Sequence, residues 1–579
     1  MHLNSSTVVA VIKVFIFFVM ILATPAFFHA YSQEPSGEVL KQLEKKETLP
    51  KEEPEKEVPV IKEQEEKEAP QVTGGPKVYI KAFKIEGATI FDQANLNTVI
   101  SSYQEKELTL SEINQAADSI TAAYRQRGYL IANAFIPAQD IKDGVVIIKV
   151  VEGKIGNITI AGNENYTTEF IRGHIEKIKQ DPSLKEQTLT RSLLLLNDYP
   201  SLNVFASLKA GTEPGATDVA IAALDTYPII FGSLSYDNFG TTTLSKHRAI
   251  LSLDIGNLAT SGDLLMLRGV TGLDTIDINK LSYGRIEYSI PIDYNGTKTG
   301  IYYANSLYEA GENLTPLVIK GEANIAGIYI TNPIIKTIDT TLSLKLAFDY
   351  KDIYDYILYT QRSQDKIRTG SLGATYDTTD NLYLSARNLL SLNYFRGMGG
   401  GFLGGTGDND KNASRLHANG EFNKYTLDVV RIQKLSNYNL VILRGSGQYS
   451  PDPLFIAEQF TIGGAGSVRG FNPSSSSGDS GYNVTAELQL SPLFAEETLF
   501  NQKIGDTIKV ALFADHGGVF RNDLQPGEAQ DDYLVGVGAG IRLYYQKSLS
   551  VRVDYAIPEI KGDFNTDKSE TYIQAALSF

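Results

Sequence analysis

Apolar and polar residues alternate one by one along Leu342-Ser343-Leu344-Lys345-Leu346-Ala347-Phe348-Asp349-Tyr350. Successive side chains of a β-strand point to opposite faces, so this spacing predicts a strand with one apolar face and one polar face. The pattern recurs at 484–490 and 549–557 and continues through residues 227–579. A membrane barrel with lipid outside and water inside requires such strands. A water-soluble β-sandwich produces the same alternation with its polar face outward, so the alternation alone leaves both folds open.

The C-terminal strand favours the barrel, as does the N-terminal segment described below. The last strand, 571–579, places Ile573, Ala575, Leu577 and Phe579 on one face and ends on that Phe. At about ten residues per strand plus turns, residues 227–579 accommodate a transmembrane antiparallel β-barrel of about sixteen strands.

The N-terminus has the features of an export signal. Lys13 precedes an apolar run at 14–23, and small residues follow up to Ala26 or Ala30, either of which could be the cleavage point. The run is about half the length that a bilayer-spanning helix needs. We therefore expect residues 1–30 to be a signal peptide, with a retained membrane anchor as the alternative.

The composition narrows the choice of function. The net charge of −15 argues against nucleic acid as a partner, because binding phosphates needs clustered Lys and Arg. The chain has no cysteine, which excludes a disulfide framework and a Cys-ligated zinc site and suits passage through an oxidising compartment. Tyr (32) and Phe (25) are abundant, as aromatic girdles require, although any β-rich chain can share this feature.

Residues 31–76 are rich in Glu, Lys and Pro, and we expect an extended linker there because such a segment buries too little apolar surface to fold. Within it, residues 36–46 begin at a cap-like Ser and contain good helix formers. This stretch predicts a short helix, and a transient helix in a flexible tail is the alternative.

Two compact α+β units are expected between the linker and the barrel, at 77–153 and 154–226. In the first, strands at 78–85, 130–136 and 145–151 flank a helix that begins near Thr109 and stops at Gly128. In the second, a strand at 155–161 precedes helices at 167–177 and 189–196 and strands at 204–209 and 217–224. The similar element order indicates an internal repeat.

Several stretches resemble the outer-membrane transporters of two-partner secretion, the TpsB or haemolysin secretion/activation (ShlB/FhaC/HecB) family. The first unit resembles the family's first POTRA domain at eleven positions: Tyr124, Gly128, Tyr129, Pro137, Ala138, Gln139, Asp140, Gly144, Val151, Glu152 and Gly153. The second resembles the next POTRA domain at 194–200 and in a closing segment from Gly211 to Asp218, although Ala210 stands where a Pro is usual. Residues 236–240 are similar to the first barrel strand.

The most specific resemblance lies in two barrel motifs. Val468, Arg469, Gly470 and Phe471 are similar to the tip of a long loop that folds back into the barrel, and Phe513, Asp515 and Gly517 are similar to a strand motif on the inner wall. Independently of the resemblance, period two places Phe513, Asp515 and Gly517 on the lumen face and 508, 510, 512 and 514 on the lipid face. We expect Asp515 to accept a bidentate contact from Arg469, and we expect His516 to be a rim or interface residue on the opposite face.

The resemblance implies that POTRA domains in the periplasm capture an unfolded secreted partner of the adhesin or haemolysin (TpsA) type. The chain would export it through the barrel as an outer-membrane monomer, and the helix at 36–46 would plug the pore. A barrel-assembly insertase and a passive porin are the alternatives. No catalytic constellation, metal site or cofactor motif is apparent: the Gly run at 463–466 lacks a following Lys-Ser/Thr, and no G-x-S-x-G elbow is present.

Overall fold

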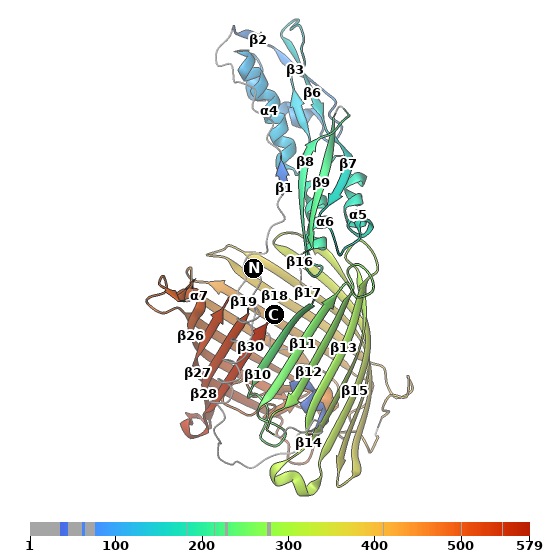
Figure 1. Cartoon of the computed structure of the whole chain (residues 1–579), viewed down its shortest axis with the longest axis vertical. Helices are drawn as coiled ribbons and strands as arrows, with labels where there is room; N and C mark the ends of the chain where they lie inside the picture. Colours follow the sequence, from blue (N-terminus) through green and yellow to red (C-terminus); the bar gives the residue numbers. More distant parts are fainter. Residues whose placement is uncertain are drawn as a thin grey trace.

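The computed structural model describes residues 35–44, 61–63, 76–181, 183–213, 215–225, 230–274, 280–408, 410–499, 501–546 and 548–579. Two small α+β units stack end to end, and the second unit lies against one end of a large barrel (Figure 1). The predicted signal peptide and most of the predicted linker lie outside the described residues. Within the described ranges, no helix has both the length and the apolar character needed to span a bilayer.

The first unit comprises β2 (Val78–Ile80), β3 (Ala82–Glu86), α3 (Gln93–Val99), β4 (Lys106–Leu108), α4 (Leu110–Gln126), β5 (Asn133–Phe135) and β6 (Val145–Val151). Its main sheet has the order β3-β6-β5, with β3 parallel and β5 antiparallel to β6. Helix α4 begins at the predicted position because Thr109 and Glu112 form a reciprocal capping box. The strand expected at 78–85 is divided, since β2 pairs with β4 while β3 pairs with β6.

The second unit comprises β7 (Lys154–Ala161), α5 (Thr168–Ile175), α6 (Glu186–Asn197), β8 (Leu202–Ala210) and β9 (Ala216–Asp225). The order β7-β9-β8, with β7 parallel and β8 antiparallel to β9, repeats the topology of the first unit. The outer edge of β8 is occupied by β1 (Ile61–Glu63), a piece of the predicted linker that pairs with it in parallel.

The barrel closes through sixteen long antiparallel strands, because β10 pairs with β30 as well as with β11. Its strands are β10 (Ile230–Asp237), β11 (Arg248–Gly256), β12 (Leu264–Gly272), β13 (Leu281–Pro291), β14 (Lys298–Glu309), β15 (Lys320–Lys336), β16 (Thr340–Ile357), β17 (Thr360–Asp380), β18 (Ala386–Gly397), β19 (Asn423–Lys434), β20 (Leu440–Tyr449), β23 (Ser480–Leu490), β26 (Ile508–Phe520), β27 (Asp531–Tyr545), β28 (Leu549–Ile560) and β30 (Glu570–Ser578). The two-residue β29 (Asp563–Phe564) adds a short pairing to β28. Closure confirms the predicted barrel over the sandwich alternative and leaves no backbone edge unpaired in hydrocarbon.

The two faces of the wall differ as the alternation predicted. On β26, Val510 and Leu512 are exposed on the outside, whereas Phe513 and Asp515 are buried on the inside. Toward the end of the barrel far from the α+β units, rings from neighbouring strands gather into an outer girdle. There the His516 ring lies 5.5 Å from the Tyr482 ring and 6.4 Å from the Tyr533 ring. His516 is thus part of an aromatic belt of the kind found where a barrel meets the membrane surface.

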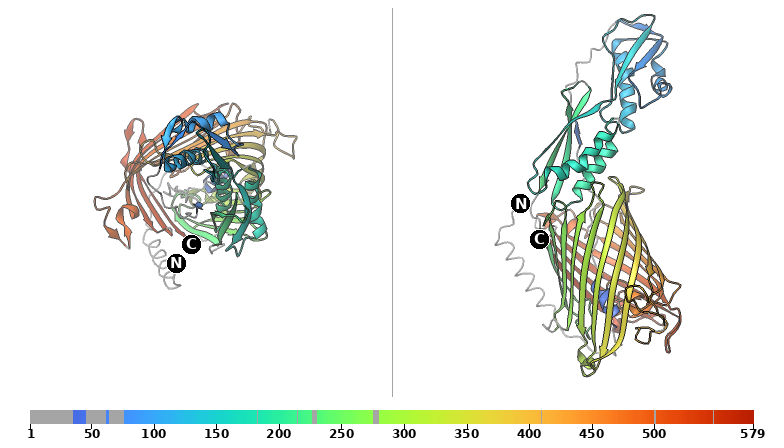
Figure 2. Two further views of the ribbon diagram at one scale, coloured as in Figure 1. Left: turned by 90° about the horizontal axis from the view of Figure 1, so that it is seen from above. Right: turned by 90° about the vertical axis from the view of Figure 1, so that its right-hand side faces the viewer.

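The second unit docks on the near rim of the barrel through buried and charged contacts. The His174 ring is fully buried, 5.5 Å from the Tyr199 ring of its own unit and 5.3 Å from the Tyr294 ring in a barrel turn. An ion pair of 2.6 Å between Lys336 Nζ and Asp198 Oδ2 adds a second contact. These contacts hold the unit over the mouth of the barrel (Figure 2).

Candidate functional site

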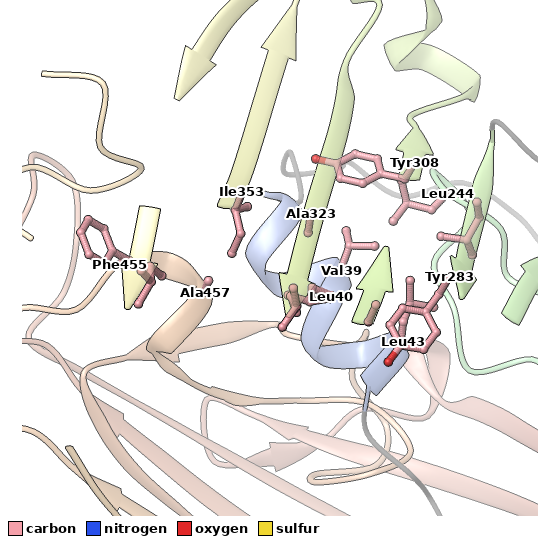
Figure 3. Close-up of a cluster of buried hydrophobic side chains, with 14 of the residues drawn as sticks. Val39, Leu40, Leu43, Leu244, Tyr283, Tyr308, Ala323, Ile353, Phe455 and Ala457 are labelled. Atoms are coloured by element: carbon pink, nitrogen blue, oxygen red, sulfur yellow. The ribbon is translucent and has the colours of Figure 1, made fainter. Parts of the chain in front are cut away.

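Helix α2 (Ser36–Glu44) lies inside the barrel (Figure 2). Its apolar residues Val39, Leu40 and Leu43 are buried against inward-facing side chains of the wall and of the 450–479 loop (Figure 3). The prediction of a helix at 36–46 is confirmed for its described part, 36–44. Its burial explains why so short a segment is stable, since an isolated helix of this length is marginal in water.

Polar contacts fix α2 at both ends and along its length. At its first turn, the Ser36 amide and hydroxyl both donate to Asp355 Oδ1, at 2.8 and 2.5 Å. In the middle, Lys41 Nζ donates to the carbonyl oxygens of Ile456 and Gln459 at 2.6 and 2.5 Å. At the last turn, Arg268 Nη1 donates to the Glu44 carbonyl at 3.1 Å. The helix thus bridges the wall and the 450–479 loop.

The structure brings the tip of the 450–479 loop to the inner wall of β26. Arg469 Nε donates to Asp515 Oδ2 at 2.7 Å and Arg469 Nη2 to Asp515 Oδ1 at 2.9 Å, which is the bidentate geometry that favours Arg over Lys. The Arg469 amide also donates to Asp515 Oδ2, at 3.1 Å. The guanidinium stacks on Phe513, with Cζ 3.3 Å from the ring centroid, so the two motifs singled out in the sequence meet directly.

Arg469 also reaches two carboxylates that the sequence reasoning did not select. Its Nη1 lies 3.1 Å from Glu487 Oε2 and 3.1 Å from Asp554 Oδ2. Arg542 pairs with the same two carboxylates, at 3.0 and 2.5 Å, and Arg552 Nε donates to Asp554 at 2.7 Å.

Three guanidinium groups and three carboxylates therefore share one buried site. All six side chains are at most 6% exposed. Such a network is tolerable in a low-dielectric interior because the charges balance and the hydrogen-bonding groups are largely paired. It ties the loop tip to β23, β26, β27 and β28 together.

Close backbone contacts hold the loop tip. Gly470 has a φ of +97°, which favours glycine, and a Cβ there would lie 2.9 Å from the Pro558 nitrogen. Gly517 faces Val468, which is fully buried, and a Cβ on Gly517 would lie 2.9 Å from its side chain. Tyr572 Oη accepts from the Gly470 amide at 3.1 Å and donates to the Phe471 carbonyl at 2.8 Å.

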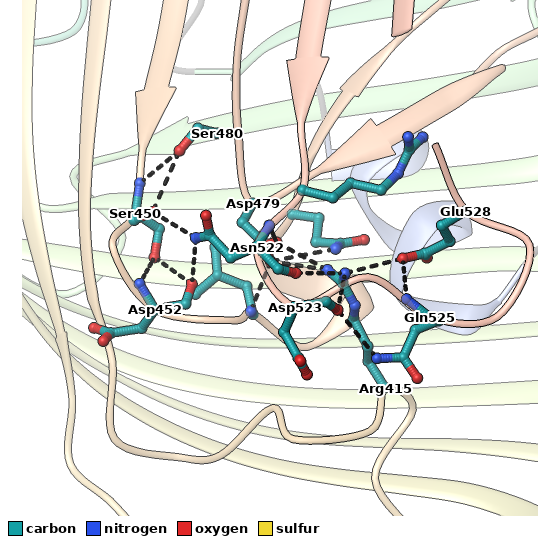
Figure 4. A network of polar contacts seen from close by, with 12 residues as sticks. Arg415, Ser450, Asp452, Asp479, Ser480, Asn522, Asp523, Gln525 and Glu528 are labelled. Atoms are coloured by element: carbon teal, nitrogen blue, oxygen red, sulfur yellow. Dashed lines mark hydrogen bonds and ion pairs between the residues drawn. The ribbon is translucent and has the colours of Figure 1, made fainter. Parts of the chain in front are cut away.

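A second buried network lies among the loops at the far end of the barrel (Figure 4). The Arg415 guanidinium lies 3.0 Å from both carboxylate oxygens of Asp479 and 3.1 Å from Glu528 Oε2, and it donates to the carbonyls of Asn522 and Asp523. These residues come from three connections, 398–422, 450–479 and 521–530. The three loops are therefore joined at the end of the barrel opposite to the α+β units.

In the first unit, Tyr124 and Glu152 come together although they lie 28 positions apart. The Glu152 carboxylate accepts from Tyr124 Oη at 2.8 Å, from the Thr89 and Ile90 amides at 2.6 and 2.7 Å, and from the Thr89 hydroxyl. Gln139 bridges the Ile147 amide and carbonyl at 2.8 and 2.7 Å.

The glycines of this predicted signature serve backbone geometry. Gly128, Gly144 and Gly153 all have positive φ, at +83°, +71° and +76°. Tyr129 packs edge-on against Phe91 at 5.7 Å. Pro137 and Asp140 lie in the segment between β5 and β6. This set thus maintains the fold of the unit and does not gather into one surface site.

We expect Glu152→Gln to destabilise the first unit by about 1.5–3 kcal/mol, the usual value of hydrogen bonds to a charged group. Burial raises the pKa of Glu152, but the hydrogen bonds from Thr89, Ile90 and Tyr124 outweigh it and hold the pKa below its usual value. The stabilisation is therefore complete above the unfolded pKa of about 4.3 and disappears as the pH falls through the folded pKa. Hydrogen exchange of 78–153 in the full chain checks this, with Glu86→Gln, an exposed carboxylate, as control; equal exchange in both variants would contradict it.

The comparisons with known proteins agree on one family. Residues 215–543 match the family model of the haemolysin secretion/activation protein ShlB/FhaC/HecB, and residues 78–153 match the ShlB-type POTRA domain. The heme/hemopexin transporter protein HuxB of Haemophilus influenzae is 27% identical over 83% of this chain and 83% of its own. The outer membrane transporter CdiB of Dickeya dadantii is 25% identical over 77% and 80%. The solved structure of CdiB from Escherichia coli shares the fold, with a TM-score of 0.69 at 20% identity over 88% of this chain and 92% of that one.

Proposed function

The chain belongs to the haemolysin secretion/activation (ShlB/FhaC/HecB) family, and from this premise we propose that it exports a partner protein across the outer membrane through its barrel. The α+β units lie in the periplasm and the three joined loops face the cell exterior. The observation that carries the proposal is the combination of a closed barrel, an internal helix and a docked loop tip. The lumen is occupied by α2 and by the tip of the 450–479 loop, both of which are parts of this chain.

The second α+β unit is proposed to be a POTRA domain like the first. Its support is topological. The sheet order β7-β9-β8, with β7 parallel and β8 antiparallel to β9, repeats the order and directions of β3-β6-β5 in the first unit. The two units, at 77–153 and 154–226, would together guide an extended chain toward the mouth of the barrel. The proposed activity is that of a monomer and involves no catalysis.

The insertase and porin alternatives are less well supported. A porin needs no periplasmic domain matched to a POTRA model, and this chain has one at 78–153. Helix α2 occupies the lumen and fits a pore that must be closed at rest, which favours the exporter over the insertase. The Arg469 and Asp515 contact is common to both readings and does not separate them.

A direct test is co-expression with a candidate partner, a large secreted protein if the neighbouring gene encodes one, in a host that lacks both. The proposal expects the partner at the cell surface or in the medium only when this chain is present. Deletion of residues 77–153 should abolish export while the barrel still inserts. Export that proceeds equally without the chain would refute the proposal.

Capture of the partner is proposed to use β-augmentation, in which a sheet edge supplies its backbone groups to an extended chain. In the structure β1 occupies the edge of β8, with Lys62 paired to Ser207. A partner strand can therefore add to this edge only after β1 leaves.

We accordingly expect Lys62→Pro to strengthen binding of an unfolded partner fragment, because proline removes a backbone donor and disfavours strand pairing. Lys62→Ala keeps the backbone donor and is the matched control. Fluorescence anisotropy of a labelled partner fragment measures the affinity. Identical affinity of both variants and the parent chain would show that β1 does not compete.

A further inference from the structure

Residues 491–499 and 501–507 form a side lobe between β23 and β26, at the periplasmic end of the barrel. It contains β24 (Thr498–Leu499), β25 (Gln502–Lys503) and α7 (Ile504–Thr507) and projects sideways from the wall (Figure 1). The connections 257–263, 292–297, 337–339, 381–385 and 435–439 at the same end are all much shorter. Closing a hairpin here does not require such a length, so the lobe needs another explanation.

The lobe presents apolar side chains to its surroundings. Leu493 is fully exposed and Phe494 is 53% exposed. Scattered apolar residues on a protein surface need no explanation, but an adjacent exposed pair on an extra lobe calls for one.

Internal contacts hold the lobe in one conformation. The Gly505 amide donates to the Ala495 carbonyl at 2.9 Å and the Ile504 amide to the Glu497 carbonyl at 2.8 Å. A Cβ on Gly505 would lie 2.6 Å from the Tyr438 ring, so the lobe also packs on the neighbouring turn. The exposed pair is therefore presented by a folded element.

The lobe that carries the exposed pair adjoins a wall whose outer face meets lipid. The lobe leads directly into β26, whose Val510 and Leu512 are exposed on the outer wall. A sideways lobe at this level lies along the boundary between the acyl chains and the periplasm. At such a boundary, apolar side chains enter the membrane while polar groups stay in water.

We propose that the side lobe inserts Leu493 and Phe494 into the periplasmic leaflet and so binds phospholipid next to β23 and β26, the strands that carry Glu487 and Asp515. The burial of these apolar side chains stabilises the contact with lipid, and electrostatic attraction does not. Glu496, Glu497 and Asp506 outnumber Lys503, whose Nζ lies 2.8 Å from Glu496 Oε2. The contact therefore does not depend on anionic lipid.

The absence of native cysteine allows a direct test in the full-length protein. Leu493→Cys is labelled with a small polarity-sensitive fluorophore and reconstituted into phosphatidylethanolamine–phosphatidylglycerol vesicles. Quenching by a phospholipid spin-labelled near its headgroup is compared with quenching by aqueous iodide. Leu512→Cys on the lipid face and Val99→Cys in the first unit are the membrane and water references.

The label at position 493 should show a lipid-to-iodide quenching ratio several-fold above that at position 99 and close to that at position 512. The ratio should persist when phosphatidylcholine replaces phosphatidylglycerol. A ratio equal to that at position 99 would overturn the proposal, and so would quenching by lipid that requires phosphatidylglycerol. The readout needs no exported partner, so its failure is distinguishable from failure of the export function.

Discussion

Arg469→Ala is expected to abolish export of the partner while the barrel still inserts in the outer membrane. The change leaves Asp515 buried without the guanidinium that it accepts from, whereas Glu487 and Asp554 keep Arg542 as a partner. Breaking one side of a buried ion pair costs about 3–5 kcal/mol. At about 1.4 kcal/mol per factor of ten, the docked state of the loop becomes roughly two to three orders of magnitude less populated.

Export is measured as partner in the medium, and insertion as heat-modifiable migration of the barrel. Arg387→Ala is the matched control, because Arg387 pairs with Asp377 at 2.8 Å on the same barrel but its side chain is 37% exposed. Such an exposed pair contributes about 0–1 kcal/mol. Wild-type export by Arg469→Ala would show that the docked loop tip has no part in transport.

The buried site of three guanidinium groups and three carboxylates also predicts how strongly related variants impair export. Asp515→Ala should act in the same direction as Arg469→Ala but more weakly, because Arg469 keeps Glu487 and Asp554. The exchange Arg469→Asp with Asp515→Arg should rescue nothing, since the new Asp would face those two carboxylates. Rescue by the exchange would show that the pair acts alone, outside the network.

Removing helix α2 by deletion of residues 36–44 is expected to raise single-channel conductance several-fold, because the helix and its side chains, about 10–12 Å across, fill part of the lumen. Leu40→Asp should have the same direction of effect, since it places a charge among the apolar side chains around Leu40, which is 3% exposed.

Conductance is recorded in planar bilayers at fixed salt. Gln42→Ala is the control on the same helix, because Gln42 is only partly buried and is not part of the apolar cluster around Leu40. Unchanged conductance in the deletion variant would mean that ions pass by a route that α2 does not obstruct.

The barrel could be predicted because the pattern that specifies its strands lies in short stretches of sequence. Alternation with period two assigns each strand residue to lipid or lumen without knowledge of its neighbours, and it placed Phe513 and Asp515 inside. The capping box at Thr109 and Glu112 likewise fixed the start of α4 from four adjacent residues.

The charge network could not be predicted in the same way. Period two puts Glu487, Arg542, Arg552 and Asp554 on inner faces, but which of them meet depends on the register between strands. Arg542 stands opposite Arg552, an unfavourable pairing that the wall carboxylates Glu487 and Asp554 offset. Arg469 reaches the site from a loop, whose course no periodicity describes.

The short strand that the linker forms could not be predicted from the sequence either. Strand β1 has three residues, and its partner β8 lies about 140 positions away in the chain. Such a segment carries no periodic signal of its own and is a strand only because β8 offers an unpaired edge. The division of 78–85 into β2 and β3 arises similarly, from two competing partners, β4 and β6.

The central claim, passage of the partner through the lumen, is tested most directly by photo-crosslinking on β16. Lys345 lies on the inner face, with Nζ 4.7 Å from the Tyr329 ring centroid, and its neighbour Leu346 is 58% exposed on the outer face. A photoreactive residue is placed at either position while a partner with a folded C-terminal domain is stalled during export. If the partner passes through the lumen, crosslinks to it form from position 345 and not from position 346. Crosslinks from position 346 alone, with the partner stalled across the membrane, would contradict passage through the lumen.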